Sequence, residues 1–177
     1  AFGFSVGKYL TDSFRLELEA TKRTGYEFDA GFTIAPAPTT ANEAKIETHA
    51  LFINGFYDFQ PFFLRNTAIT PYLGGGVGIS RNKMGTTVIH NNGIPNGFTT
   101  DGNTINEFAY KLSAGTLVSL TEQLSLDVNY QYANLGAFKG GTAIYNNGVF
   151  VGNLQRGING GEIKSQELMV GLQYTFK

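Results

Sequence analysis

The sequence contains no cysteine and no tryptophan, and what it lacks excludes several classes of protein. Without cysteine, neither a disulfide-stapled scaffold nor a thiolate metal site can form. The 13 basic and 14 acidic residues give a formal net charge of −1, so composition offers no electrostatic case for binding nucleic acid. No apolar run approaches the ~18 residues of a membrane-spanning helix, yet an alternating membrane barrel would also show ordinary hydropathy.

What the sequence does contain is apolar residues at every second position, the pattern of β-strands rather than helices. In the stretch ELMVGLQYTFK (167–177), large apolar residues alternate with small or polar ones almost without exception. We predict seven such strands, at residues 2–10, 14–22, 47–60, 70–84, 107–120, 123–135 and 163–177. Most have ten residues or more, which exceeds the ~5–6 of globular strands and suits the ~9–11 of a tilted membrane crossing.

The connections between these strands alternate between short and long. The short ones are residues 11–13, 61–69 and 121–123, and the long ones are 23–46, 85–106 and 136–162. Short turns on one side and long loops on the other are typical of an outer-membrane barrel, with periplasmic turns and extracellular loops. We therefore predict one all-β domain over residues 1–177, an antiparallel up-and-down transmembrane β-barrel in the bacterial outer membrane with periplasmic termini.

Side-chain size indicates which face of the strands points inward. The face opposite the large apolar residues is crowded with small ones, namely Gly74, Gly76, Gly78, Ala109, Ser113, Gly115, Ser125 and Gly171. A soluble barrel would turn that face to water and carry long polar side chains there. A narrow eight-stranded lumen has room only for packed side chains, so small residues suit it. The apolar face is therefore interpreted as lipid-facing, and a soluble ligand-binding barrel is the least favoured alternative.

Charged residues on the small face are expected to meet inside the barrel. They are Arg15, Glu17, Glu19, Lys111, Asp127 and Glu167. Mutual pairing would offset the cost of removing these charges from water. Two glutamates beside an arginine could also act as an acid–base pair, but a lumen ion-pair network is the preferred interpretation. The packed lumen would leave no open channel of the porin type.

Seven strands conflict with the even number found in bacterial single-chain barrels, since closure removes edges that lipid does not tolerate. We therefore expect eight strands. The first strand would be missing from the given sequence, or another chain would supply it, or a long loop would contain it, for example at residues 148–155.

No motif indicates enzymatic chemistry. The stretch GGGVGIS (74–80) lacks the GK[ST] ending of a phosphate-binding loop and is read as a strand with small lumen-facing residues. His49 and His90 have no metal-ligand spacing, and no serine lies near His49 in the sequence for acyl transfer. We predict no enzyme activity, no cofactor and no metal site.

Three segments resemble a known family. ITPYLGGGVGIS (69–80), EFAYKLSAGTLVSLTEQLSLDVNYQYANLGAF (107–138) and LMVGLQYTF (168–176) are similar to the small outer-membrane β-barrel superfamily. This is the OmpA/OmpX-like group, including surface antigens and adhesins of rickettsia-like bacteria. The resemblance implies biogenesis by the barrel-assembly machinery, whose signal in such families is the terminal aromatic strand. Leu172, Tyr174 and Phe176 match that signal here.

Function is expected in the extracellular loops, because a rigid barrel frees them from stability constraints. The first hypothesis is adhesion or recognition of a host or neighbouring-cell ligand. The second is a structural protein that self-associates through its loops into a surface array or sheath. The segment TAIYNNGVF (142–150) is apolar enough that we expect it to bind a partner. Its candidate contact residues are Ile144, Tyr145, Val149 and Phe150. Outer-membrane lipid is the other expected partner.

Overall fold

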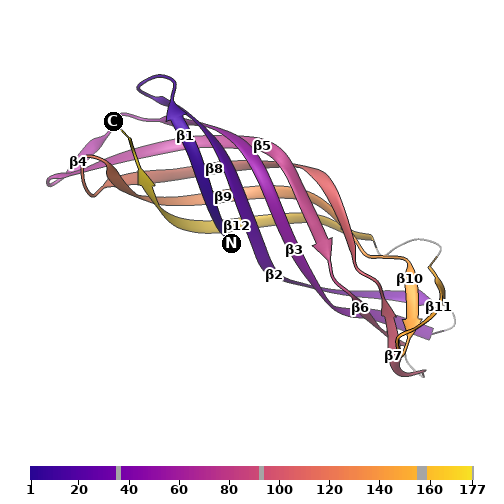
Figure 1. The fold of residues 1–177 in the computed structure, drawn as a ribbon. Helices are drawn as coiled ribbons and strands as arrows, with labels where there is room; N and C mark the ends of the chain where they lie inside the picture. Colours follow the sequence, from indigo (N-terminus) through magenta and orange to yellow (C-terminus); the bar gives the residue numbers. More distant parts are fainter. Residues whose placement is uncertain (35–36, 92–93, 155–158, 177) are drawn as a thin grey trace.

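The computed structural model is a 12-stranded antiparallel sheet that curls into a barrel wall and continues beyond it (Figure 1). It describes residues 1–34, 37–91, 94–154 and 159–176, with backbone alone for 26–34, 37–43, 89–91 and 94–97. The strands are β1 (Phe2–Tyr9), β2 (Phe14–Ile34), β3 (Ala37–Asp58), β4 (Phe62–Leu64), β5 (Thr67–Met84), β6 (Thr87–Asn91), β7 (Ile94–Thr100), β8 (Asn103–Ser119), β9 (Leu124–Lys139), β10 (Ala143–Asn146), β11 (Val149–Asn153) and β12 (Asn159–Tyr174). Within these ranges, no helix has the length and apolarity to cross a bilayer.

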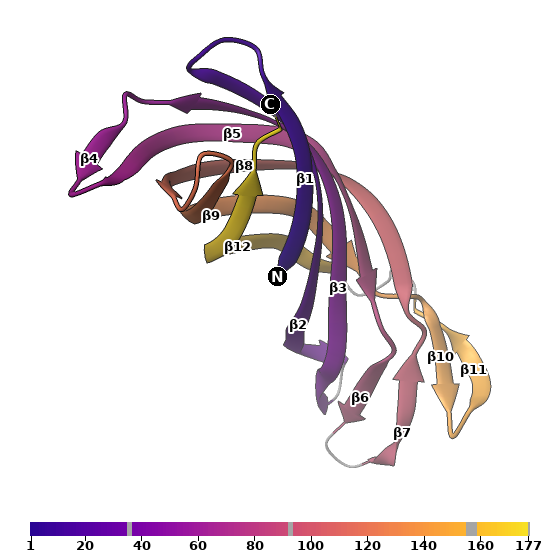
Figure 2. The ribbon, with the colours of Figure 1, turned by 60° about the vertical axis from the view of Figure 1, so that its left-hand side comes forward.

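Seven long strands form the barrel wall in the order β1-β2-β3-β5-β8-β9-β12, each antiparallel to its neighbours. These are the seven strands predicted from alternation, which the structure confirms. The wall curves until β12 comes round towards β1 and β2 (Figure 2). Side chains of β12 reach those of β2 across the lumen. In the described part of the chain, β1 pairs only with β2 and β12 only with β9. The eighth strand therefore stays a prediction.

Side chains alternate between the two faces along most of the wall. On β3, Leu51, Ile53 and Tyr57 are exposed on the outside, whereas Phe52 and Phe56 are buried inside. The outer faces of the other wall strands carry the same kind of exposed apolar side chains. Local alternation thus generates an apolar outer surface, as its period of two requires.

Glycines on β5 make room for large side chains on β3. The register pairs Phe52 with Gly78 and Phe56 with Gly74, so each inward phenylalanine lies beside a residue without a side chain. A Cβ atom on Gly74 would overlap the Phe56 ring. Large and small residues therefore alternate between neighbouring strands, which lets a narrow lumen pack densely.

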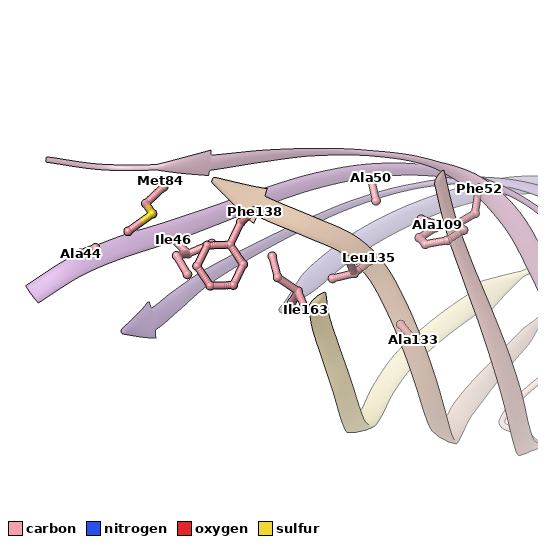
Figure 3. Close-up of a cluster of buried hydrophobic side chains, with 10 residues drawn as sticks. All are labelled: Ala44, Ile46, Ala50, Phe52, Met84, Ala109, Ala133, Leu135, Phe138 and Ile163. Carbon is pink, nitrogen blue, oxygen red and sulfur yellow. The ribbon is translucent and has the colours of Figure 1, made fainter. Parts of the chain in front are cut away.

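Apolar side chains fill the lumen from mid-barrel towards the long loops (Figure 3). The cluster consists of Ala44, Ile46, Ala50, Phe52, Met84, Ala109, Ala133, Leu135, Phe138 and Ile163. Nearer the short turns, Phe56 and Tyr72 meet edge to face with ring centroids 5.4 Å apart. The sequence interpretation expected mainly small and polar residues inside. The difference arises because small residues on one strand accommodate aromatic ones on the next.

The three segments predicted as long loops contain strands. Residues 23–46 continue β2 and β3, which reach 21 and 22 residues. Residues 85–106 include β6 and β7, and residues 136–162 include β10 and β11. These shorter strands extend the sheet in the order β3-β6-β7-β10-β11, here called the loop sheet. The hidden strand suggested at residues 148–155 is β11, but it pairs with β10 and not between β1 and β12.

Candidate functional site

Charged side chains in the lumen are arranged at three levels. Nearest the short turns, Arg15 is 5% exposed and contacts both Glu17 and Asp58. Its Nη1 donates to Gln173 Oε1 at 2.9 Å, a bond from β2 to β12. Tyr9 Oη donates to Asp58 Oδ2 at 2.7 Å. The guanidinium also lies over two aromatic rings, 4.7 Å from the centroid of Phe56 and 5.2 Å from that of Tyr72. Its charge is therefore shared among several partners.

At mid-barrel, Lys111 on β8 reaches across the lumen to Glu19 on β2. Asn54 Nδ2 donates to Glu19 Oε2 at 2.6 Å, and the Lys111 ammonium lies 5.5 Å from the centroid of the Phe52 ring. At the short-turn level, where Tyr72 pairs with Asp58, Tyr72 Oη donates to Asp127 Oδ1 at 2.7 Å. The half-buried carboxylates of Glu19 and Asp127 thus each accept a hydrogen bond, which offsets part of their desolvation.

Nearest the loops, Arg23 on β2 forms an ion pair with Glu167 on β12. Arg23 Nε donates to Glu167 Oε1 at 2.9 Å and Nη2 donates to Oε2 at 3.1 Å, a bidentate contact. Gln131 Nε2 donates to the same carboxylate at 2.6 Å, and Arg23 Nη1 donates to Thr21 Oγ1 at 2.7 Å. The Arg23–Glu167 contact thus joins β2 to β12, two strands whose described residues are not paired through their backbones.

The structure places all six predicted lumen residues on the inward face. Two ion pairs form among them, Arg15–Glu17 and Lys111–Glu19. Asp127 bonds instead to Tyr72 and Asn129, and Glu167 to Arg23. Arg23 and Asp58 were not predicted as partners. Arg23 continues the inward alternation of β2 by two residues from Thr21, a signal that was available but fell in a segment read as loop.

These groups bond mainly to one another and help to hold the wall together. Arg15 pairs with Glu17 on its own strand and with Asp58 on the neighbouring strand, whereas Arg23–Glu167 and Lys111–Glu19 cross the lumen. Within the described ranges, no three His, Cys, Asp or Glu side chains are grouped to hold a metal ion. The lumen therefore acts as a packed core, and surfaces outside it are the place to look for recognition.

The four predicted contact residues lie together on the hairpin of β10 and β11. Its turn has positive φ at both central residues, 47° at Asn147 and 81° at Gly148, as in a type I′ turn. Rings of Tyr145 and Phe150 pack across the hairpin with centroids 5.9 Å apart. Ile144 and Tyr145 are half-buried, whereas Val149 is 67% exposed and Phe150 54% exposed.

One further member of this surface was not predicted. Val151 follows on β11 and is 53% exposed. We call Val149, Phe150 and Val151 the apolar tip. The hairpin is not isolated, because β10 pairs with β7 through Ile144 and Thr100, among others. The loop sheet thus presents exposed apolar side chains from a supported hairpin.

The predicted assembly-signal residues share the outer face at the end of β12. Leu172, Tyr174 and Phe176 are all exposed, and the Tyr174 and Phe176 rings meet with centroids 4.9 Å apart. Leu172 and Tyr174 lie on β12 and Phe176 two residues beyond its end, and β12 has one free edge in the described part of the chain.

Comparison with known proteins agrees with this architecture. The family model of the outer membrane protein beta-barrel domain matches residues 1–176. The chain belongs to that family. It is 31% identical over 146 residues to "Outer membrane protein PagN" of Salmonella typhimurium, covering 76% of this chain. The match covers 56% of PagN, so the chain spans little more than half the length of that relative. No solved structure matches the chain.

Family membership places the barrel in the bacterial outer membrane. The exposed apolar outer face is the surface that meets lipid, and the long loops lie on the extracellular side, as is general for such barrels. Above the lipid-facing part of β12, exposed Lys164 lies 3.0 Å from Glu162. The hydrogen bond from Lys164 lowers the pKa of the Glu162 carboxyl. The expected outer-membrane β-barrel is confirmed.

Proposed function

We propose that this protein is a non-enzymatic surface barrel whose loop sheet recognises a partner outside the cell. The observation that carries the proposal is the apolar tip, where Val149, Phe150 and Val151 expose 67%, 54% and 53% of their surfaces. Val149 and Val151 lie on one face of β11 and Phe150 on the other, so this strand at the end of the loop sheet exposes apolar side chains on both faces. Exposed apolar clusters of this kind mark interaction sites. The tip belongs to the loop sheet, beyond the wall strands whose apolar faces meet lipid (Figure 1).

The hairpin that carries the tip supports recognition because it is held in shape before any partner binds. Pairing to β7, the type I′ turn and the Tyr145–Phe150 ring contact all restrict it. A preorganised surface loses less conformational entropy on binding than a free loop. Burying two large apolar side chains stabilises a complex by about 1.5–3 kcal/mol each.

The test compares cells that display the wild-type barrel with cells that display Val149→Ser/Phe150→Ser at equal surface level. We expect adhesion to host-cell layers, or to neighbouring bacteria, to fall about tenfold or more in the variant. Lys164→Ser, an exposed change on β12, serves as the control and should leave adhesion unchanged. Equal adhesion by the tip variant would refute recognition through the tip.

A second candidate is self-association into a surface array, supported by a different observation. In the described part of the chain, β11 pairs only with β10 and ends the loop sheet. A free strand edge is a ready template for pairing with another chain. Crosslinking on cells would separate the candidates, because an array predicts crosslinked copies of this chain that the same tip variant loses.

A further inference from the structure

A second outward surface, unrelated to the loop sheet, carries positive charge directly above the lipid-facing band. Lys22 on β2, His49 on β3, and Arg81 and Lys83 on β5 all point outward, as their alternation with buried neighbours shows. We call these four residues the outer basic patch. His49, Arg81 and Lys83, with Glu47 and Thr104, line one hollow on this face.

The strand registers fix the height of the patch. Leu51 pairs with Ile79, and both are exposed apolar residues of the lipid-facing band. Two residues further towards the loops, His49 pairs with Arg81, and two residues beyond these Glu47 pairs with Lys83. Since a strand rises ~3.4 Å per residue, the charges begin ~7 Å from the last apolar side chains. They lie where lipid headgroups would meet the barrel wall.

The patch carries a surplus of positive charge that its neighbours do not neutralise. Lys22 Nζ lies 3.7 Å from Glu47 Oε1, an exposed and weak ion pair. Among the described residues, neither Arg81 nor Lys83 forms an ion pair. Three basic side chains less one carboxylate leave +2 here, although the whole chain carries −1.

The surplus lies on one side of the barrel. On the next strand, β8, the register partners of Arg81 and Lys83 are Asn106 and Thr104, which are uncharged. A uniform ring of charge would serve any interface with water. A local cluster above the lipid band indicates a specific anionic group at that place.

We propose that the outer basic patch binds the phosphate groups of a phosphorylated glycolipid in the outer leaflet. Arginine and lysine are the side chains that recognise phosphate, and basic clusters beside membrane-spanning segments bind anionic headgroups. The lipid source is favoured over a free anion because the patch is continuous with the surface that holds acyl chains. Leu51 and Ile79 would contact the chains of the same lipid whose phosphates meet Arg81 and Lys83.

The test uses the folded protein in phosphatidylcholine nanodiscs doped with bisphosphorylated lipid A or with its dephosphorylated form. Native mass spectrometry then counts the retained glycolipid molecules. Each basic side chain near a membrane surface contributes about fivefold to headgroup affinity, so both together give roughly 30-fold. We expect the wild type to prefer the phosphorylated form and Arg81→Ala/Lys83→Ala to lose that preference.

Two further variants separate site-specific binding from general charge. Lys8→Ala/Arg65→Ala removes two positive charges at the periplasmic end, from β1 and the β4–β5 turn, and should keep the preference. Arg81→Lys/Lys83→Arg should also keep it. The proposal is overturned if wild type binds both lipids equally, if the periplasmic variant loses the preference as well, or if millimolar inorganic phosphate displaces the lipid.

Discussion

Arg23 and Glu167 make the contact whose loss should weaken the barrel most clearly. They lie 144 residues apart in the sequence, on β2 and β12, and join the two sides of the wall across the lumen. The Arg23 side chain is 1% exposed and that of Glu167 15% exposed. The change to make is Arg23→Met, which keeps an unbranched apolar side chain in place of the aliphatic part of arginine and removes the charged guanidinium.

The expected cost follows from what the substitution leaves behind. Without Arg23, the Glu167 carboxylate stays in the lumen with Gln131 as a neutral donor at 2.6 Å. Removing one partner of a buried ion pair costs about 3–5 kcal/mol, because the other charge is left uncompensated. Replacing both partners avoids that penalty. Arg23→Met/Glu167→Leu should therefore recover most of the lost free energy of unfolding.

The assay is urea unfolding in lipid vesicles under reversible conditions, followed by far-UV circular dichroism because the chain has no tryptophan. The adjacent Lys22→Met is the control. Its ion pair with Glu47 is longer, at 3.7 Å, and its side chain is 37% exposed, so the cost should be about 0–1 kcal/mol. Equal losses in Arg23→Met and Lys22→Met, or a double variant as unstable as the sum of the single ones, would refute the reasoning.

Two glycine substitutions test the packing and the hairpin separately. Gly115→Ala places a Cβ 2.7 Å from Cζ of Tyr72, and such overpacking should lower the free energy of unfolding by about 1–3 kcal/mol. Gly171→Ala, with nothing within 4 Å, is its control, and equal unfolding midpoints would contradict the packing described here. Gly148→Ala meets no atom but has φ of 81°, so it should weaken only the β10–β11 hairpin, by about 1 kcal/mol. Faster amide exchange in that hairpin with an unchanged barrel midpoint is the expected result, and a lower midpoint would show that the hairpin supports the wall.

Three strands of the loop sheet, β6, β7 and β10, could not be predicted from the sequence. Residues 85–106 are rich in Asn, Gly and Thr and show no alternation, yet they contain β6 and β7. Backbone pairing holds them in place, because β6 pairs with the wall strand β3 and β7 pairs with β6. Pairing of this kind requires no side-chain pattern, because every residue except proline carries the same donor and acceptor. Val149 and Phe150 of the apolar tip were nonetheless visible in TAIYNNGVF, where Asn-Gly marks a turn between apolar residues.

The sequence by itself determined the seven wall strands and which face of each strand turns inward. Both follow from period-two alternation and from side-chain size, which are local properties of the chain. Only the tertiary structure decided how the inward residues combine. Glu167 meets Arg23, Glu19 meets Lys111 and Phe52 lies beside Gly78 because strand register and the curvature of the wall bring distant residues together. The same registers set His49 beside Arg81 above the lipid band, a neighbourhood that no sequence spacing could reveal.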